Sequence, residues 1–227
     1  MKTALIICGA LAREVMEIVR RHGWDVDVVG VSALDHLFPE RIAPDVEGKI
    51  LAVREQYERV VVVYGDCGSK GALDATLARH GVERVAGPHC YEMYGGPLFE
   101  ELLAEEPGTF FLTDFLVRSF NGAVVKGLGL DRFPKLKDAY FRNYTRVVYM
   151  AQTRDPALED KARKIGGYLG FPLEIRYTGL GLLEERLVAL MSVPPAATLS
   201  PVSVPGENGR AVKMSKTRRR RHRRRAV

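Results

Sequence analysis

Short runs of apolar residues alternate along the chain with longer stretches in which apolar residues recur every three or four positions. The run at 60–63 is four valines, which is typical of a strand buried on both faces of a parallel sheet. The longer stretches have the spacing of amphipathic helices. We predict strands at residues 3–7, 26–31, 60–64, 83–87, 109–112, 146–151 and 172–178. We predict helices at residues 10–22, 46–57, 70–80, 91–105, 113–120, 156–169 and 182–191.

This alternation of strand and helix predicts an α/β protein. We expect a mainly parallel sheet with helices on both faces, a Rossmann-like three-layer architecture formed by a single domain at 1–193. Residues 194–209 are rich in Pro, Ser, Val and Gly and are predicted to be a linker. Residues 210–227 are predicted to be a disordered Arg-rich tail.

The charge of the chain is concentrated in that tail. The formal net charge is +6, but residues 210–227 hold ten of the 34 basic residues and no acidic one. Residues 1–209 therefore carry 24 basic against 28 acidic residues, and the positive charge gives no reason to expect a fold that binds nucleic acid. Nucleic-acid binding by the tail alone is one interpretation, and a solvated appendage or a chance extension of the reading frame is the other.

The sequence predicts a cytoplasmic protein with reduced thiols. The first apolar run is followed at once by charged residues, and no stretch approaches 18 uncharged apolar residues. The chain has three cysteines, an odd number that gives no disulfide framework. The cysteines are then buried apolar residues, reactive thiols or metal ligands.

Each of the three cysteines follows a predicted strand. Cys8 and Cys67 come after the first and third strands, His89 and Cys90 after the fourth, and His36 lies in the loop after the second. In a parallel sheet these connections open on one edge, where α/β proteins bind ligands. We therefore predict that these five side chains converge as metal ligands, and that the cofactor is zinc or an iron–sulfur cluster.

Further candidates lie beside the cysteines. We expect Gly9, Gly65 and Gly68 to let the backbone approach a cofactor closely. The candidates for a catalytic role are Cys67, at a helix start, together with Glu14 and Asp66. A solvated charge is the alternative for Glu14, and a local turn hydrogen bond is the alternative for Asp66.

Two further function classes stay open, an enzyme that uses a thiol without metal and a small-ligand binding module without chemistry. In the thiol enzyme Cys67 is the nucleophile, with His89 or His36 as its base. In the binding module the cysteines only pack tight turns. The chain has no GxxxxGK[ST], strand-borne GxGxxG, GxSxG or HExxH motif, which argues against the enzyme classes that use them.

Seven sequence blocks, among them CGALAREV, YGDCGSKG, GPHCYEMY and FFLTDFLVRSF, resemble the domain-of-unknown-function family numbered 1638 over about residues 1–193. Members of that family are often encoded beside corrinoid proteins and methyltransferases. The resemblance therefore implies a role in corrinoid-dependent methyl transfer, as an enzyme or accessory factor, with a small-molecule or corrinoid-protein partner. Cys8, His36, Cys67, His89 and Cys90 all fall within the family's blocks.

The chain departs from the family pattern at two places. Leu37 and Phe38 stand where the family has polar residues, and Phe133 stands where a histidine is expected. A ligand set that needs that histidine would not be complete here.

Overall fold

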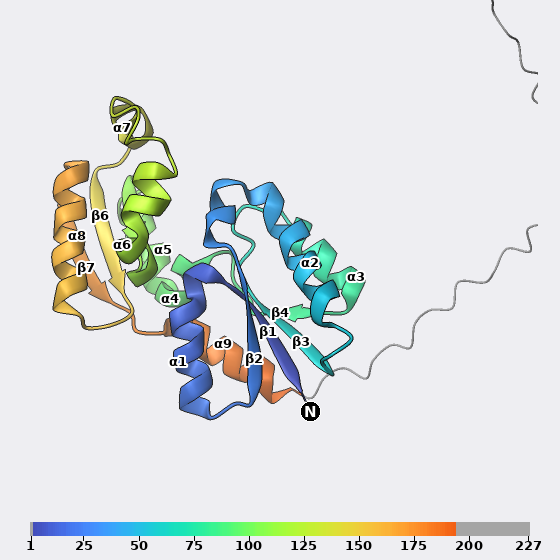
Figure 1. The fold of residues 1–227 in the computed structure, drawn as a ribbon. Helices are drawn as coiled ribbons and strands as arrows, with labels where there is room; N and C mark the ends of the chain where they lie inside the picture. The colour runs from blue at the N-terminus through green and yellow to red at the C-terminus, as the bar shows by residue number, and fades with distance from the viewer. Residues whose placement is uncertain (1, 194–227) are drawn as a thin grey trace, which may run out of the picture. The chain divides into compact units, whose positions relative to one another are not determined.

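The computed structural model describes residues 2–193, and its strands form two sheets in which every neighbouring pair is parallel (Figure 1). The predicted α/β class with parallel strands and surrounding helices is confirmed. The predicted linker and tail, residues 194–209 and 210–227, lie outside the described residues. The first sheet has the order β2-β1-β3-β4, with β1 Thr3–Cys8, β2 Val26–Val31, β3 Arg59–Val63 and β4 Glu83–Arg84. The second has the order β5-β6-β7, with β5 Thr109–Leu112, β6 Arg146–Ala151 and β7 Leu173–Tyr177.

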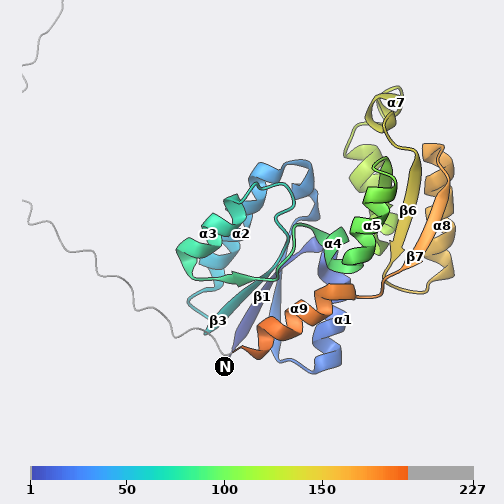
Figure 2. The same cartoon turned by 180° about the vertical axis from the view of Figure 1, so that it is seen from behind.

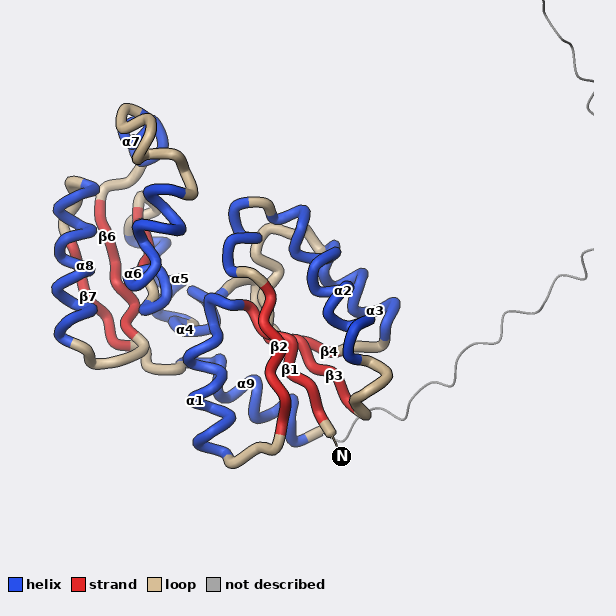
Figure 3. Tube along the Cα trace, in the orientation of Figure 1, coloured by secondary structure: helices blue, strands red, loops and turns tan. Residues whose placement is uncertain are grey.

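Helices connect nearly all of these strands (Figure 3). The α-helices are α1 Ala12–His22, α2 Ile42–Val53, α3 Ala72–His80, α4 Cys90–Gly95, α5 Pro97–Glu105, α6 Asp114–Phe120, α7 Leu136–Phe141, α8 Pro156–Leu169 and α9 Gly181–Ser192. Short 3-10 helices occur at Gly9–Leu11, Ala33–Leu37 and Pro39–Arg41, and a π-helix at Asn121–Lys126 continues α6. Within the described residues, no helix is both long and apolar enough to cross a membrane.

The first sheet lies between two layers of helices. Helices α2 and α3 cover one face, and α1 and α9 cover the other (Figures 1 and 2). On α1 the buried residues Val15 and Ile18 are three positions apart, as one face of a helix requires. Helix α9 follows the last strand of the second sheet, yet its Leu183 and Leu187 are completely buried in the core of the first.

Strand β6 shows how the two sheets share a core. Because side chains alternate along a strand, Val148 faces the core of the first sheet while Val147 and Tyr149 face a separate core with α8. Helices α4 and α5 add Met93 and Phe99 to the same core as Val148. One face of the second sheet is therefore packed against the elements that hold the first.

Among the helix predictions that differ from the structure, two involve a proline. The predicted helix 91–105 is two helices, because Gly96 has a left-handed φ of 51° and Pro97 starts a new helix. Helix α2 begins at Ile42 rather than after Asp45. Pro44 did not prevent this earlier start, since the first turn of a helix does not need the backbone N–H that proline lacks.

Candidate functional site

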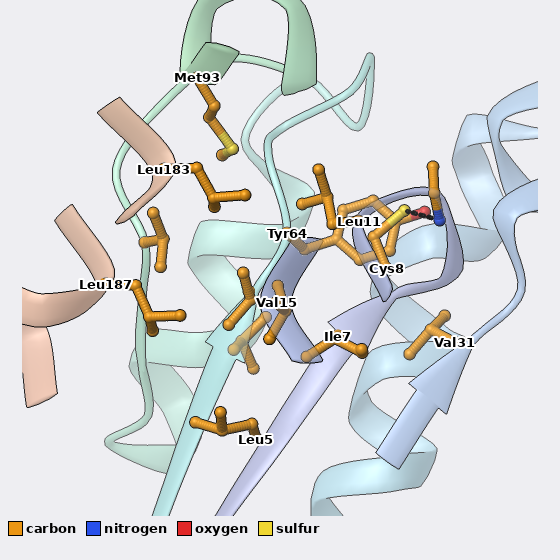
Figure 4. Packing of buried hydrophobic residues seen from close by; sticks show 14 of the residues in the cluster. Leu5, Ile7, Cys8, Leu11, Val15, Val31, Tyr64, Met93, Leu183 and Leu187 are labelled. Atoms are coloured by element: carbon orange, nitrogen blue, oxygen red, sulfur yellow. Dashed lines mark hydrogen bonds between the residues drawn. The ribbon is translucent and has the colours of Figure 1, made fainter. Parts of the chain in front are cut away.

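The three cysteines lie at the carboxyl ends of three adjacent strands. Cys8 is the last residue of β1, and its sulfur accepts the N–H of Ala10 at 3.4 Å (Figure 4). Cys67 lies just beyond β3, with a left-handed φ of 47°. Cys90 follows β4 and is the first residue of α4. Since β1, β3 and β4 are parallel neighbours, all three connections open on one edge of the sheet.

Glycines allow these connections to lie close together. A Cβ on Gly65 would lie 2.8 Å from the Cα of His89, so the Cys67 loop can approach the Cys90 loop only with glycine there. The N–H of Cys67 donates to the carbonyl of Pro88 at 2.8 Å. Gly9 makes a similar approach to the end of β2, and Gly68 has a left-handed φ of 89°. The three glycines predicted to contact a cofactor thus shape and join the loops.

We expect Gly65→Ala to lower the free energy of unfolding by about 1–3 kcal/mol, because backbone atoms of the neighbouring loop would have to move. Urea unfolding followed by circular dichroism measures the loss. Gly48→Ala is the matched control, since Gly48 lies in α2 with nothing near its missing Cβ. It should gain about 0.5–1 kcal/mol. An equal response of the two variants would contradict the close approach.

Burial dominates the acidity of all three thiols. It raises the pKa of Cys8 to about 11 and of Cys67 to about 12, and it raises the pKa of Cys90 well above its usual range. The thiols also act on one another: Cys8 raises the pKa of Cys67, and both raise that of Cys90. Thiols with raised pKa values are poor nucleophiles, which argues against the metal-free thiol enzyme.

Two buried polar atoms beside the thiols have no hydrogen-bond partner within the described part of the chain. They are the hydroxyl of Tyr64 and Oδ2 of Asp35. The Tyr64 side chain lies against the sulfur of Cys8 (Figure 4), and the charge of Asp35 acts on both groups. Tyr64 and Asp35 thus add two polar groups to the surroundings of Cys8.

The two histidines differ in their roles. The ring of His36 stacks on Tyr64 with centroids 5.6 Å apart, and its Nδ1 lies 2.9 Å from the carbonyl of Ala33. A carbonyl only accepts, so Nδ1 carries the proton and Nε2 is left as an acceptor. In contrast, Nδ1 of His89 accepts the N–H of Glu92 at 3.3 Å and caps α4. His36 thus packs on Tyr64, which lies beside Cys8, whereas His89 caps a helix.

An apolar cavity of about 220 Å³ adjoins this group. His36 and Cys90 line it from the first sheet's side, and Phe110 and Thr113 from the second's. The π-helix 121–126 forms part of its wall, and such widened turns are frequent at functional sites. No three His, Cys, Asp or Glu side chains of residues 2–193 are grouped as they would be around a single metal ion.

The catalytic candidates Asp66 and Glu14 lie apart from one another. The carboxylate of Asp66 accepts hydrogen bonds from Ser69, Lys70 and Gly71 within its own turn. Glu14 is only 5% exposed and faces Arg118 across a polar cleft. The alternative of a solvated charge at Glu14 is therefore wrong, whereas the alternative of a local turn bond at Asp66 is confirmed.

Sequence reasoning missed a buried network around Asp114. Asp114 follows the cap of α6, which is Thr113, whose hydroxyl accepts the N–H of Leu116 at 3.3 Å. The carboxylate of Asp114 instead binds Arg118, four residues along the helix, at 3.2 Å. This i,i+4 spacing of acid and base was the available signal.

We expect Glu14→Gln to stabilise the fold at pH 7. Burial raises the pKa of Glu14, and the negative charge of Asp114 raises it further. The ionised carboxylate is therefore less stable in the folded than in the unfolded chain. The gain should shrink as pH falls toward the unfolded pKa of about 4.3, where the wild-type carboxyl becomes protonated. Urea unfolding at pH 7 and at about pH 4 tests this. In Glu17 on the same helix, the bond to Arg20 lowers the pKa, so Glu17→Gln should not stabilise at pH 7.

Comparison with known proteins gives one family. The family model described as Protein of unknown function (DUF1638) matches residues 31–187, more than half of the chain. No curated protein matches the chain.

Proposed function

The chain belongs to the DUF1638 family, and we propose that it holds an iron–sulfur cluster on Cys8, Cys67 and Cys90 at the carboxyl edge of the first sheet. One observation carries the proposal. Three thiols stand on three separate connections that open on one edge of the first sheet, at the carboxyl ends of adjacent parallel strands.

We favour a cluster over a single zinc ion. A zinc ion needs each ligand sulfur about 2.3 Å from a common centre, and the described residues offer no such group. In an iron–sulfur cluster each thiolate binds a different iron atom, so the sulfurs stand further apart. Three thiols on three separate connections suit the second arrangement.

The donor chemistry agrees with this assignment. Thiols select soft metals, and a thiol that coordinates a metal loses its proton outright. Without metal, burial keeps Cys8, Cys67 and Cys90 protonated, so loading a cluster would release protons. The unpartnered hydroxyl of Tyr64 would lie beside the bound sulfurs, where hydrogen bonds tune an iron–sulfur cluster.

Three cysteines leave one iron of a four-iron cluster without a protein thiolate. We expect His36 to be the ligand of that iron. Its Nδ1 is used by the carbonyl of Ala33, which leaves Nε2 for a metal, and the side chain lines the apolar cavity beside Cys90. A cluster with an open iron supplies electron transfer or Lewis-acid chemistry. The association of the family with corrinoid methyltransferases makes corrinoid-dependent methyl transfer the process in which we expect this chemistry.

Elemental analysis of the full chain, purified without oxygen, tests the proposal. We expect about four iron and four sulfide per chain after reconstitution, with broad visible charge-transfer absorption. One tightly bound zinc per chain and no iron would contradict the cluster. No metal at all would leave the second candidate, a small-ligand binding module, which the apolar cavity favours.

A further inference from the structure

A polar cleft lies beside the first turns of α1 and α6. Its volume is about 480 Å³, and a smaller cavity of about 280 Å³ adjoins it. Arg13, Glu14 and Arg118 line both. The loop after β6 contributes Gln152 and Thr153, so the cleft collects groups from the carboxyl ends of strands in both sheets. None of the proposed cluster ligands lines it.

Arg118 is held rigidly in this cleft. Its Nη2 donates to Oδ2 of Asp114 at 3.2 Å. Asp114 is completely buried and is itself fixed by Tyr149, whose hydroxyl donates at 2.5 Å, by the N–H of Gln152 at 3.0 Å and by the hydroxyl of Thr153 at 2.6 Å. A guanidinium anchored by one nitrogen loses little conformational entropy when a ligand binds the other.

The other nitrogen of Arg118 is free. Its Nη1 is buried and has no hydrogen-bond partner among residues 2–193. Oε1 of Glu14 lies 4.0 Å from it, close enough for an ion pair but too distant for a hydrogen bond. An unsatisfied buried donor of a charged group is costly, and a ligand oxygen in the cleft would satisfy it.

The charges around the cleft argue against a ligand with more than one negative charge. Arg21 is already paired with Glu17 and Glu184, whereas Arg13 is exposed and has no ion pair within the described residues. Arg118 already shares its charge with Asp114. Two guanidinium groups with spare donors, facing the carboxylate of Glu14, suit a monoanion better than a phosphate dianion.

We propose that this cleft binds a small monocarboxylate, with its oxygens on Nη1 of Arg118 and on Arg13. The smaller cavity extends from Arg118 along Gly9, Ala10 and Phe115. These residues offer an apolar wall for a short carbon chain. Ala10 and Phe115 also line the apolar cavity beside Cys90, so the chain of the ligand runs from the arginines toward that cavity. The binding site stands independently of the proposed cluster.

Titration of the full chain with butyrate, followed by NMR, tests the proposal. We expect saturable binding that Arg13→Gln weakens about tenfold, the effect of one charge-assisted hydrogen bond. Arg118→Lys keeps a positive charge for Asp114 but lacks the second nitrogen, and it should weaken binding by at least as much. Arg54→Gln, an exposed substitution at the end of α2, is the control and should leave the affinity unchanged.

Two results would overturn the proposal. One is butyrate binding that survives both Arg13→Gln and Arg118→Lys, or no saturable binding at all. The other is inorganic phosphate or butylamine binding as tightly as butyrate. Circular dichroism confirms that each variant is folded. Iron content, measured in the same samples, tests the cluster separately. Neither arginine is a proposed cluster ligand, so both variants should keep their iron whether or not they bind butyrate.

Discussion

Serine in place of any one of Cys8, Cys67 and Cys90 is expected to remove most of the bound iron. A hydroxyl is a poor ligand for the irons of a cluster, and each cysteine would hold a different iron. The three single variants should therefore lose iron to a similar extent. Iron and sulfide analysis after anoxic reconstitution, with the visible spectrum beside it, measures the loss.

The pattern among the variants separates the function classes. A thiol enzyme would depend sharply on one cysteine, whereas a shared cluster depends on all three. His89→Asn is the informative control, because asparagine is also a good helix cap and His89 is used as the cap of α4. This variant should keep its iron. Iron loss in His89→Asn with iron retained in a cysteine variant would contradict our assignment of ligands.

Alanine in place of Asp114 is expected to lower the free energy of unfolding by about 3–5 kcal/mol. The substitution leaves the buried side of Arg118 without its counter-charge and deprives the hydroxyls of Tyr149 and Thr153 of their acceptor. Chemical unfolding monitored by circular dichroism gives the value. Asp160→Ala, which removes an exposed partner of Arg163 on α8, should change stability by no more than about 1 kcal/mol.

A double variant isolates the cost of the uncompensated charge. In Asp114→Ala combined with Arg118→Leu the unpaired guanidinium is gone, so part of the lost stability should return. A loss below about 1 kcal/mol in Asp114→Ala would mean that the network around Arg118 contributes little to the fold. The anchoring of that arginine would then need another explanation.

The sequence pattern predicted most strands because they are short apolar runs between polar stretches. It could not divide the strands between two sheets, since the same alternation of strand and helix fits one sheet or two. The division depends on which strands pair, and Val148 and Val147 face different cores without differing in residue type. The break between α4 and α5 was readable, because Gly96 and Pro97 adjoin in the sequence.

The sequence predicted that the three cysteines lie at one edge of a sheet, because the carboxyl ends of parallel strands meet there. The polar cleft did not follow, because its residues come from α1, α6 and the loops after β6 and β7. Glu14 gave a local signal that was missed. It lies four residues before the buried Ile18, so the two side chains share one face of α1.

The return of α9 to the first sheet has a consequence for synthesis of the chain on the ribosome. Leu183 and Leu187 of α9 belong to the same core as the residues of β1. The buried side chain of Arg59, at the start of β3, donates to the carbonyls of Leu190 and Val193. The amino-terminal strands emerge first but lack these partners until α9 has left the exit tunnel. Native packing of the first sheet therefore has to wait for α9, and nascent chains stalled before residue 181 should stay sensitive to protease in β1–β3.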